Sequence, residues 1–350
     1  MLKKQGEAKG FSPVFCAKYA KKEKRTGDLW KAEDSLYNTV KTNKKIKRKE
    51  RNTYNMTKRK VLVYGSLNLD YVYQVKHFPG PGETAAAETL HISSGGKGLN
   101  QAVAFAKAGT ETYLAGKIGT DGQSLRDACE RYGIDTRYLM KEDSPGGHAV
   151  IQVDEKGQNS ILVFGGTNKM HREEEMDQVL KDFQEGDYLI LQNEINGLSY
   201  LIDAAWKKNM EIVLNPSPYK PSLMECGLQK LSWMILNEVE ACQITGENQP
   251  EKVLEYFKEK YPDLKVVLTL GEEGAMCTTG ETYCKVPCYK TETVDTTGAG
   301  DTFTGYYFAE IIRGRSPKEA LDTASKAAAV TVSRKGAADA IPFLKEILDK

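Results

Sequence analysis

The residues best suited to chemistry lie in the segment ETVDTTGAGDTFTGYYFAEII, residues 292–312. Four small or flexible residues, 297–300, come directly before Asp301 and an apolar helical pattern. Small residues leave the backbone N–H groups uncovered where a helix begins, and such groups bind anions. A carboxylate next to an anion site therefore needs a chemical explanation.

Transfer of a phosphoryl group to an alcohol would explain both features. The reaction needs hydrogen-bond donors for the charge that develops on the phosphoryl oxygens, and a base for the proton of the hydroxyl group. The amides of residues 298–300 can donate to these oxygens, and Asp301 can accept the proton. We therefore predict that Asp301 is the catalytic base and that residues 298–300 form the anion hole.

A second glycine-rich segment, SSGGKGLNQA at residues 93–102, also precedes a helical pattern. Taken alone, it is equally typical of a tight turn with a residue in the left-handed conformation. The chain contains neither the Walker A pattern Gly-x-x-x-x-Gly-Lys-Ser/Thr nor the dinucleotide-binding pattern Gly-x-Gly-x-x-Gly. The anion loop at 297–300 is therefore of another design.

Polar residues follow several of the predicted strands. Ligands of open α/β sheets bind beyond the carboxyl ends of the strands. Each of these residues alone is typical of a helix cap or a turn, but together they indicate a ligand site. They are Asn68 and Asp70 after the first strand, Glu194 after LILQ, Asn237 and Glu240 after WMIL, and Thr269 and Gly271 at the end of KVVLTLG.

A sheet must bring these residues together, and from residue 60 onward strand and helix patterns alternate. Short apolar runs, typical of a parallel sheet that is buried on both faces, are separated by helical patterns. The helical segments 98–109 and 121–132 are closed by Gly109 and Gly133. This alternation predicts an α/β fold. The strand-forming runs are KVLVYGS (60–66), TYLAGKIG, DYLILQ, EIVLNP, WMILNE and KVVLTLG.

Two stretches, 71–93 and 148–164, break the alternation, because each has the pattern of two strands without a helix. The second contains a turn near Gly157. We expect the two stretches to form a small β lid attached to the main sheet.

Composition and charge narrow the function classes. The 350 residues carry a net charge of +1, but residues 1–55 hold 16 Lys/Arg against 6 Asp/Glu, which leaves 33 against 42 in the remainder. The acidic charge of residues 56–350 argues against a nucleic-acid-binding surface on this part of the chain.

The seven cysteines form no Cys-x-x-Cys pair, which favours buried, reduced thiols of a cytoplasmic protein over a zinc site at Cys277, Cys284 and Cys288. No apolar run approaches the ~20 residues of a membrane span.

The first 57 residues are predicted to be a basic, disordered extension ahead of a domain that spans 58–350. They show no sustained helical or strand period and contain the run KTNKKIKRKER. A nuclear or nucleic-acid address is the alternative interpretation. Met56 looks like a natural start, and we expect a chain that begins there to fold like the whole.

Several segments together resemble the ribokinase-like (PfkB) carbohydrate kinase family. They occur in the family's order over residues 60–345, and the pair GGKGxN and DTxGAGD is specific to the family. The resemblance implies a three-layer α/β/α sandwich with a mainly parallel sheet and a small β-sheet lid. The segments are GSLNLD, FPGPGET, GGKGLNQAVA, LNPSP, LNEVEA, LTLGEEGA, VDTTGAGDTFTG and SRKGAADAIP.

The resemblance also implies an activity, which is ATP-dependent phosphorylation of D-ribose at O5. Mg²⁺ and an activating monovalent cation, usually K⁺, would be the cofactors. A related kinase for deoxyribose, another sugar or a nucleoside is the alternative, and an inactive sugar-binding regulator is a more distant one. The family further implies a homodimer formed through the lid, and no nucleic-acid or membrane partner.

The same segments imply the site residues. The substrate would contact Asn68, Asp70, Gly96, Lys97, Gly98, Asn100, Glu194 and Asp301. ATP would contact Asn237, Thr269, Leu270, Gly271, Glu272, Glu273, Gly274, Gly298, Ala299 and Gly300, with Glu240 near magnesium and phosphate. Potassium would lie near Asp295, Thr297, Thr331, Arg334, Gly336 and Ala340, largely on backbone carbonyl oxygens.

Two positions depart from the family pattern. Ala340 stands where relatives often offer a serine hydroxyl to the cation, which predicts a weaker or water-completed cation site. Tyr306 stands where the family prefers Ala or Gly, and we expect it to crowd the helix packing one turn beyond the anion loop.

Overall fold

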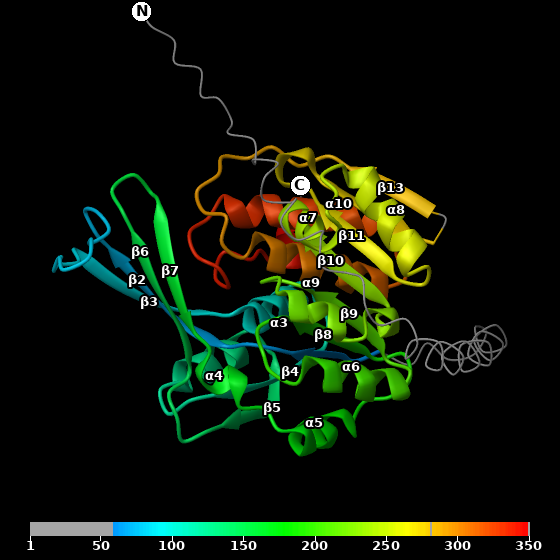
Figure 1. Ribbon diagram of the computed structural model, residues 1–350, viewed down its shortest axis with the longest axis horizontal. Coiled ribbons are helices and arrows are strands. Elements are labelled where there is room, and N and C mark those ends of the chain that lie inside the picture. The colour runs from blue at the N-terminus through cyan, green and yellow to red at the C-terminus, as the bar shows by residue number, and fades with distance from the viewer. Residues whose placement is uncertain (1–58, 281, 349–350) are drawn as a thin grey trace, which may run out of the picture. The chain divides into compact units, whose positions relative to one another are not determined.

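A nine-stranded, mainly parallel sheet forms the centre of the protein (Figure 1). The structure, a computed structural model, describes residues 59–280 and 282–348. The two antiparallel pairings of this sheet lie at one edge, where the last three strands in spatial order meet. From the other edge, its strands are β5 (Asp135–Lys141), β4 (Thr112–Ile118), β1 (Val61–Tyr64), β8 (Tyr188–Gln192), β9 (Glu211–Asn215), β10 (Trp233–Asn237), β11 (Lys265–Thr269), β12 (Ala275–Thr279) and β13 (Thr282–Val286).

Helices cover both faces of the sheet and complete three layers. Successive residues of β1 alternate between the faces: Val61 and Val63 join one buried apolar cluster, and Leu62 and Tyr64 join the other. Burial on both faces is what the apolar runs of the sequence predict, so the α/β/α sandwich is confirmed. One face packs against α3 (Lys97–Lys107), α4 (Gln123–Arg131), α9 (Ala299–Ile312), α10 (Pro317–Val332) and α11 (Leu344–Leu348), and the other against α5 (Glu173–Leu180), α6 (Leu198–Lys207), α7 (Glu238–Thr245) and α8 (Pro250–Lys260).

The predicted helix ends agree with the structure. Gly109 and Gly133, which follow α3 and α4, have φ angles of 81° and 74°. This left-handed conformation favours glycine and ends the helix. Within the described residues, four short 3-10 helices lie between the larger elements: η1 (Gly166–Lys169), η2 (Pro221–Glu225), η3 (Leu228–Lys230) and η4 (Gly271–Glu273).

A separate four-stranded sheet forms the lid, and Figure 1 shows it extending away from the main sheet. Both predicted strand pairs are antiparallel hairpins, and Gly157 lies in the second turn with a φ of 74°. A parallel pairing of the first and third strands joins the two hairpins. In spatial order the strands are β3 (Thr89–Gly95), β2 (Asn68–Gln74), β6 (Gly147–Val153) and β7 (Asn159–Phe164).

The lid begins earlier than the sequence predicts, at Asn68 rather than at residue 71. Asn68 pairs with Gly95 of β3 and with Gly147 of β6. Asn68 and Asp70 therefore follow the first strand of the main sheet, as predicted, but they lie on the first lid strand. The chain leaves the main sheet after Tyr64, and the backbone of β2 hydrogen-bonds to β3 and β6 of the lid.

Three expectations from composition can be compared with the described residues. No helix in 59–280 or 282–348 is long and apolar enough to cross a membrane, and no group of three His, Cys, Asp or Glu side chains there could hold a metal ion. Cys129 and Cys277 are buried, but Cys288 is exposed, so the expectation of buried thiols holds in part. The extension 1–57 lies outside the described residues, and its disorder stays a prediction.

Candidate active site

Asp301 lies in the first turn of α9, where the sequence pattern places it next to the anion loop. Its side chain is buried, with 6% of its surface exposed. Asn100 Nδ2 donates to Asp301 Oδ2 at 3.1 Å, and Gln101 Nε2 donates to Asp301 Oδ1 at 2.9 Å. Gln192 Nε2 in turn donates to Gln101 Oε1 at 2.8 Å. Each carboxylate oxygen thus has a donor from α3, and the carboxylate is held in one orientation while lone pairs remain for a ligand.

Gly298 is the N-cap of α9 and adopts a φ of 76°. The backbone turns there so that the helix starts at Ala299, two residues before Asp301. Gly300 has open space where a Cβ would stand, so a ligand can approach its backbone. Ala299 N donates to Thr296 O at 3.3 Å, so Gly298 and Gly300 are the residues whose amides could receive an anion here, and the anion site stays a prediction.

A cavity of about 220 Å³ adjoins this helix start. Seven of the predicted residues line it, and they come from four separate parts of the chain. Six further residues line it, and the first two of them belong to the LNPSP segment: Asn215, Ser217, Ile235, Leu236, Thr296 and Thr304. The seven predicted residues are Lys97, Asn237, Glu240, Thr269, Gly298, Gly300 and Asp301.

Lys97 carries positive charge into this cavity. Burial disfavours its ammonium group, but the charges of Asp301, Glu194 and Glu240 together outweigh burial and raise the pKa of Lys97. The Lys97 ammonium therefore interacts electrostatically with three carboxylates. A charged ammonium in a cavity beside a helix N-terminus favours a bound anion.

Glu194, one of the predicted sugar-binding residues, bonds to the start of α3 and to Ser66. Glu194 Oε2 accepts hydrogen bonds from Lys97 N, at 3.2 Å, and from the hydroxyl of Ser66. Gly98 N donates to Ser66 Oγ at 3.3 Å. Ser66 was missed as a site residue, although it belongs to the GSLNLD segment, because its link to Glu194 spans 128 residues of sequence.

Asp70 lies against the glycine turn on the lid side of the site. A Cβ at Gly95 would stand 2.0 Å from Asp70 Oδ2, so only glycine leaves room for this carboxylate. Burial, together with the nearby charge of Glu194, raises the pKa of Asp70 to about 7. The negative charge of Glu194 disfavours ionisation of Asp70, and a ligand hydroxyl or cation would relieve this.

Some of the predicted nucleotide-binding residues line the cavity, and others lie outside it. Asn237 caps α7: its Oδ1 accepts from Glu240 N at 2.9 Å, and Glu240 Oε2 accepts from Asn237 N at 3.1 Å. The Asn-x-x-Glu pattern is thus a capping box, and both residues also line the cavity. The loop 270–274 does not line the cavity, and Gly274, with a φ of 96°, packs tightly against the backbone of Val286.

The predicted cation residues surround Asp295. Its Oδ1 accepts from Thr297 N at 2.9 Å and its Oδ2 from Gly336 N at 3.0 Å. Burial disfavours the ionised form of Asp295, but the hydrogen bonds from Thr297 and Gly336 outweigh this effect and lower the pKa of Asp295. Asp295 thereby joins the anion loop to the 334–341 loop.

The residues around Asp295 supply oxygen atoms of the kind that bind hard cations. Lys107 Nζ donates to the carbonyls of Ala338, at 3.0 Å, and Ile341, at 2.7 Å, so these two oxygens already have a cationic partner. Thr331 and Arg334 offer less than predicted: the Thr331 hydroxyl bonds to Ala327 O, and the Arg334 guanidinium pairs with Glu346. Thr331 O also accepts from Arg334 N at 3.0 Å, so a cation site at these residues stays a prediction.

Tyr306 does not crowd the helix packing. Its ring is fully buried beyond the anion loop, and its hydroxyl donates to Pro342 O at 2.6 Å. A buried tyrosine is stable when its hydroxyl has such a partner. Burial also raises the pKa of Tyr306, which keeps this hydroxyl a donor.

Comparisons with known proteins identify the family of this chain. A sequence profile of the pfkB family carbohydrate kinases matches residues 58–344. The chain belongs to this family. It is 33% identical over 297 residues to a ribokinase of Haemophilus influenzae, a match that covers 82% of this chain and 96% of the relative. It is 30% identical over 298 residues to a deoxyribokinase of Salmonella typhi, with coverage of 82% and 96%.

Solved structures of PfkB-type kinases match the fold as well. A ribokinase of Arabidopsis thaliana, solved with ribose and ATP, superposes with a TM-score of 0.77 at 29% identity over 84% of this chain and 98% of the other. A ribokinase of Cryptococcus neoformans, solved with ADP, gives a TM-score of 0.73 at 31% identity over 83% and 99%. The chain is therefore a carbohydrate kinase with the fold of these proteins.

Proposed function

We propose that the chain transfers the terminal phosphoryl group of ATP to the 5-hydroxyl of D-ribose, which yields D-ribose 5-phosphate and ADP. The observation that carries this proposal is the placement of Asp301. It is a buried carboxylate with a donor on each oxygen, and it lines the same cavity as the backbone of Gly298 and Gly300. A hydroxyl group between Asp301 and a phosphate at the helix start would face a base on one side and the phosphorus on the other.

In this mechanism Asp301 accepts the hydroxyl proton as the oxygen–phosphorus bond forms. The amides of residues 298–300 and the ammonium of Lys97 stabilise the charge on the transferred phosphoryl oxygens. Asn100 and Gln101 hold the carboxylate so that its free lone pairs face the substrate. ADP leaves with the electrons of the broken oxygen–phosphorus bond.

The sugar would lie against Asn68, Asp70, Gly96, Asn100 and Glu194. Carboxylate and amide groups of this kind match the dense hydroxyl pattern of a sugar. The relative from Arabidopsis thaliana was solved with ribose and ATP, which supports the same pairing of substrates for this chain.

Two cations complete the proposal. Glu240 would lie near Mg²⁺, which neutralises phosphate charge when it is bound. The oxygen atoms around Asp295 would hold K⁺, which adds positive potential behind the anion loop. A cytoplasmic location remains a prediction from the sequence.

A coupled assay that follows ADP formation tests the function over ribose, deoxyribose, fructose and adenosine. We expect the highest kcat/KM with ribose. Deoxyribose is the second candidate, because a deoxyribokinase is among the relatives. A preference for deoxyribose, fructose or adenosine would contradict the ribose assignment and leave the kinase class intact, whereas ATP turnover that no sugar or nucleoside stimulates would contradict both.

We also propose that the lid joins two copies of the chain. Large apolar side chains are exposed on β3 and β7, among them Leu162 with 71% of its surface exposed. Exposed apolar patches of this kind mark protein interfaces. A small sheet is also marginally stable unless something covers its apolar face, and a second lid would do so. The exposed lid residues are Leu90, Ile92, Leu162 and Phe164 on one face of the sheet, and Ile161 and Val163 on the other.

A further inference from the structure

One buried amide outside the predicted site, Asn168, connects the lid to the proposed sugar contact Asn68. Asn168 lies in η1, where the chain returns from β7 to the main sheet, and 2% of its surface is exposed. Its Oδ1 accepts from Leu67 N at 3.0 Å. Its Nδ2 donates to Leu67 O at 3.2 Å and to Asn68 Oδ1 at 2.8 Å. Both hydrogen atoms of this amide are therefore used.

These contacts determine which way the Asn68 amide faces. A backbone N–H can only donate and a backbone carbonyl can only accept, so Leu67 fixes the orientation of the Asn168 amide. The Nδ2 of Asn168 then requires an acceptor, which makes Oδ1 the Asn68 atom that faces it. In the part of the chain that the structure describes, no group hydrogen-bonds to Asn68 Nδ2. Asn68 thus keeps two N–H donors for a ligand.

The close approach of the two amides depends on a glycine. A Cβ at Gly147 would stand 2.1 Å from Asn168 Nδ2 and 2.4 Å from Asn68 Oδ1. Any larger residue at the start of β6 would push the amides apart. The fold therefore reserves this space for the Asn68–Asn168 hydrogen bond.

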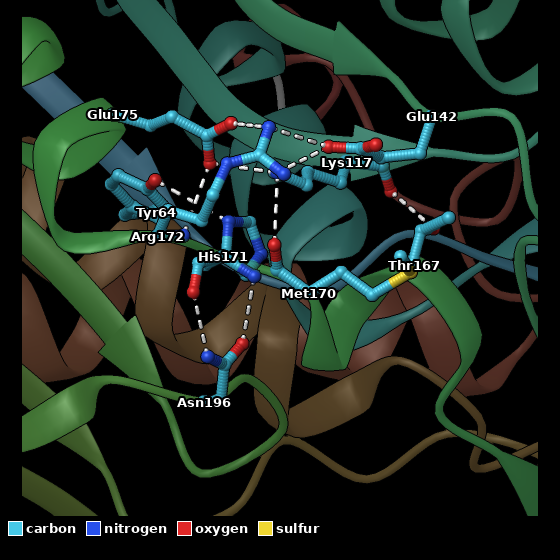
Figure 2. Close-up of polar contacts among 9 residues, drawn as sticks. All are labelled: Tyr64, Lys117, Glu142, Thr167, Met170, His171, Arg172, Glu175 and Asn196. Atoms are coloured by element: carbon cyan, nitrogen blue, oxygen red, sulfur yellow. Dashed lines mark hydrogen bonds and ion pairs between the residues drawn. The ribbon is translucent and has the colours of Figure 1, made fainter.

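The segment that carries Asn168 is anchored on both sides by Lys117 of β4 (Figure 2). The hydroxyl of Thr167 donates to Lys117 O at 3.0 Å, and Lys117 Nζ donates to Met170 O at 2.9 Å. The Lys117 side chain is fully buried and also pairs with Glu142 at 2.5 Å and Glu175 at 2.7 Å. Figure 2 shows both carboxylates converging on Lys117 and Arg172. These hydrogen bonds and ion pairs of Lys117 attach the segment that carries Asn168 to β4 of the main sheet.

We infer that Asn168 is a positioning residue for the sugar site: it holds the Asn68 amide so that Nδ2, and not Oδ1, faces the substrate. Asp70 lies two residues further along β2 and on the same face of the strand. One donor and one acceptor at this spacing suit neighbouring hydroxyl groups, each of which can accept and donate. The inference rests on the proposed function, because it takes Asn68 to contact the sugar.

The test compares Asn168→Ala and Asn168→Asp with a matched control, Asn196→Ala. Asn196 makes the same kind of clamp on the return segment: its Oδ1 accepts from His171 N at 3.0 Å, and its Nδ2 donates to His171 O at 2.8 Å (Figure 2). It has no hydrogen bond to Asn68 among the described contacts. The near-isosteric Asn168→Asp keeps the hydrogen bond from Leu67 N but offers Asn68 only acceptors. The Asn68 amide must then rotate so that Nδ2 faces residue 168 and Oδ1 faces the ligand.

For both Asn168 variants we expect the KM for the sugar to rise at least tenfold, or ~1.4 kcal/mol, while the KM for ATP stays within twofold. Asn196→Ala should lower Tm and leave both KM values within twofold. In an Asn68→Ala background, Asn168→Ala should raise the sugar KM no further. The substrate is the one that the wild type prefers among ribose, deoxyribose, fructose and adenosine.

Four outcomes would overturn the inference while leaving the proposed function intact. Two concern the kinetics of the Asn168 variants: a sugar KM within twofold of wild type, or an equal rise of the KM values for sugar and ATP. The other two are a rise of the sugar KM in Asn196→Ala as large as in the Asn168 variants, and loss of folding in both Asn168 variants. A wild-type protein that phosphorylates none of the four substrates would overturn the proposed function, and this inference with it.

Discussion

At the scale of single residues, Asp301 decides whether the site is catalytic. Asp301→Asn should lower kcat by about 10²–10⁴, the usual contribution of a positioned base. Ribose affinity should change far less, because the amide can still hydrogen-bond a hydroxyl. Steady-state kinetics with ribose and ATP measure both quantities. The exposed Asp127→Asn on α4 is the matched control and should keep wild-type kcat; near wild-type turnover in Asp301→Asn would show that another group takes the proton.

Asp70 predicts a pH dependence of stability. Burial and the charge of Glu194 raise its pKa from 3.8 to about 7, so the folded state binds a proton that the unfolded state releases. This proton stabilises the fold at low pH, and the stabilisation is lost as the pH rises through about 7. Between pH 5 and pH 8 the wild type should lose on the order of 3 kcal/mol relative to Asp70→Asn, from ~1.4 kcal/mol per pKa unit. Urea unfolding at the two pH values measures this, and parallel curves for the two proteins would contradict the raised pKa.

Which site residues could be predicted depends on how far apart their partners lie in the sequence. Asp301, Lys97 and the glycines occur in short motifs, and their residue types alone indicate their chemistry. Gln101 and Asn168 were missed because their roles come from contacts with Asp301 and Asn68, 200 and 100 residues away. Only the completed fold brings these groups together.

At the scale of secondary structure elements, the strands of the main sheet could be predicted and the start of the lid could not. Apolar runs of four or five residues correspond closely to β1, β8, β9, β10 and β11. The start of β2 at Asn68 carries no such signal, because its partners β3 and β6 lie far along the chain. Register between distant strands is a property of the fold rather than of the local sequence.

Lys117 links β4 to the return from the lid, and its removal should destabilise the fold. Lys117→Met leaves Glu142 and Glu175 without their buried counter-charge, and breaking such a pair costs about 3–5 kcal/mol. The surface pair of Lys326 and Asp322 provides the control, because Lys326→Met should cost less than ~1 kcal/mol. Urea unfolding compares the two variants. Equal losses of stability in both would contradict a structural role for the buried network.

At the scale of the whole molecule, the exposed apolar face of the lid predicts a homodimer. Light scattering at micromolar concentration should give twice the mass of one chain. Leu162→Asp places a charge in the centre of this face and should yield the monomer mass, because an unpaired charge in an apolar interface is costly. Val239→Asp, at an exposed position of α7, should leave the dimer intact. A monomeric wild type, or a dimeric Leu162→Asp variant, would contradict pairing through the lid.

The position of the transferred phosphate tests the central claim most directly. The proposed geometry places a primary sugar hydroxyl between Asp301 and the amides of residues 298–300. Phosphorus and proton NMR of the product from ribose and ATP should therefore show one phosphomonoester, coupled to the two protons on C5. A phosphate on any other carbon, or inorganic phosphate released with unmodified ribose, would contradict the account.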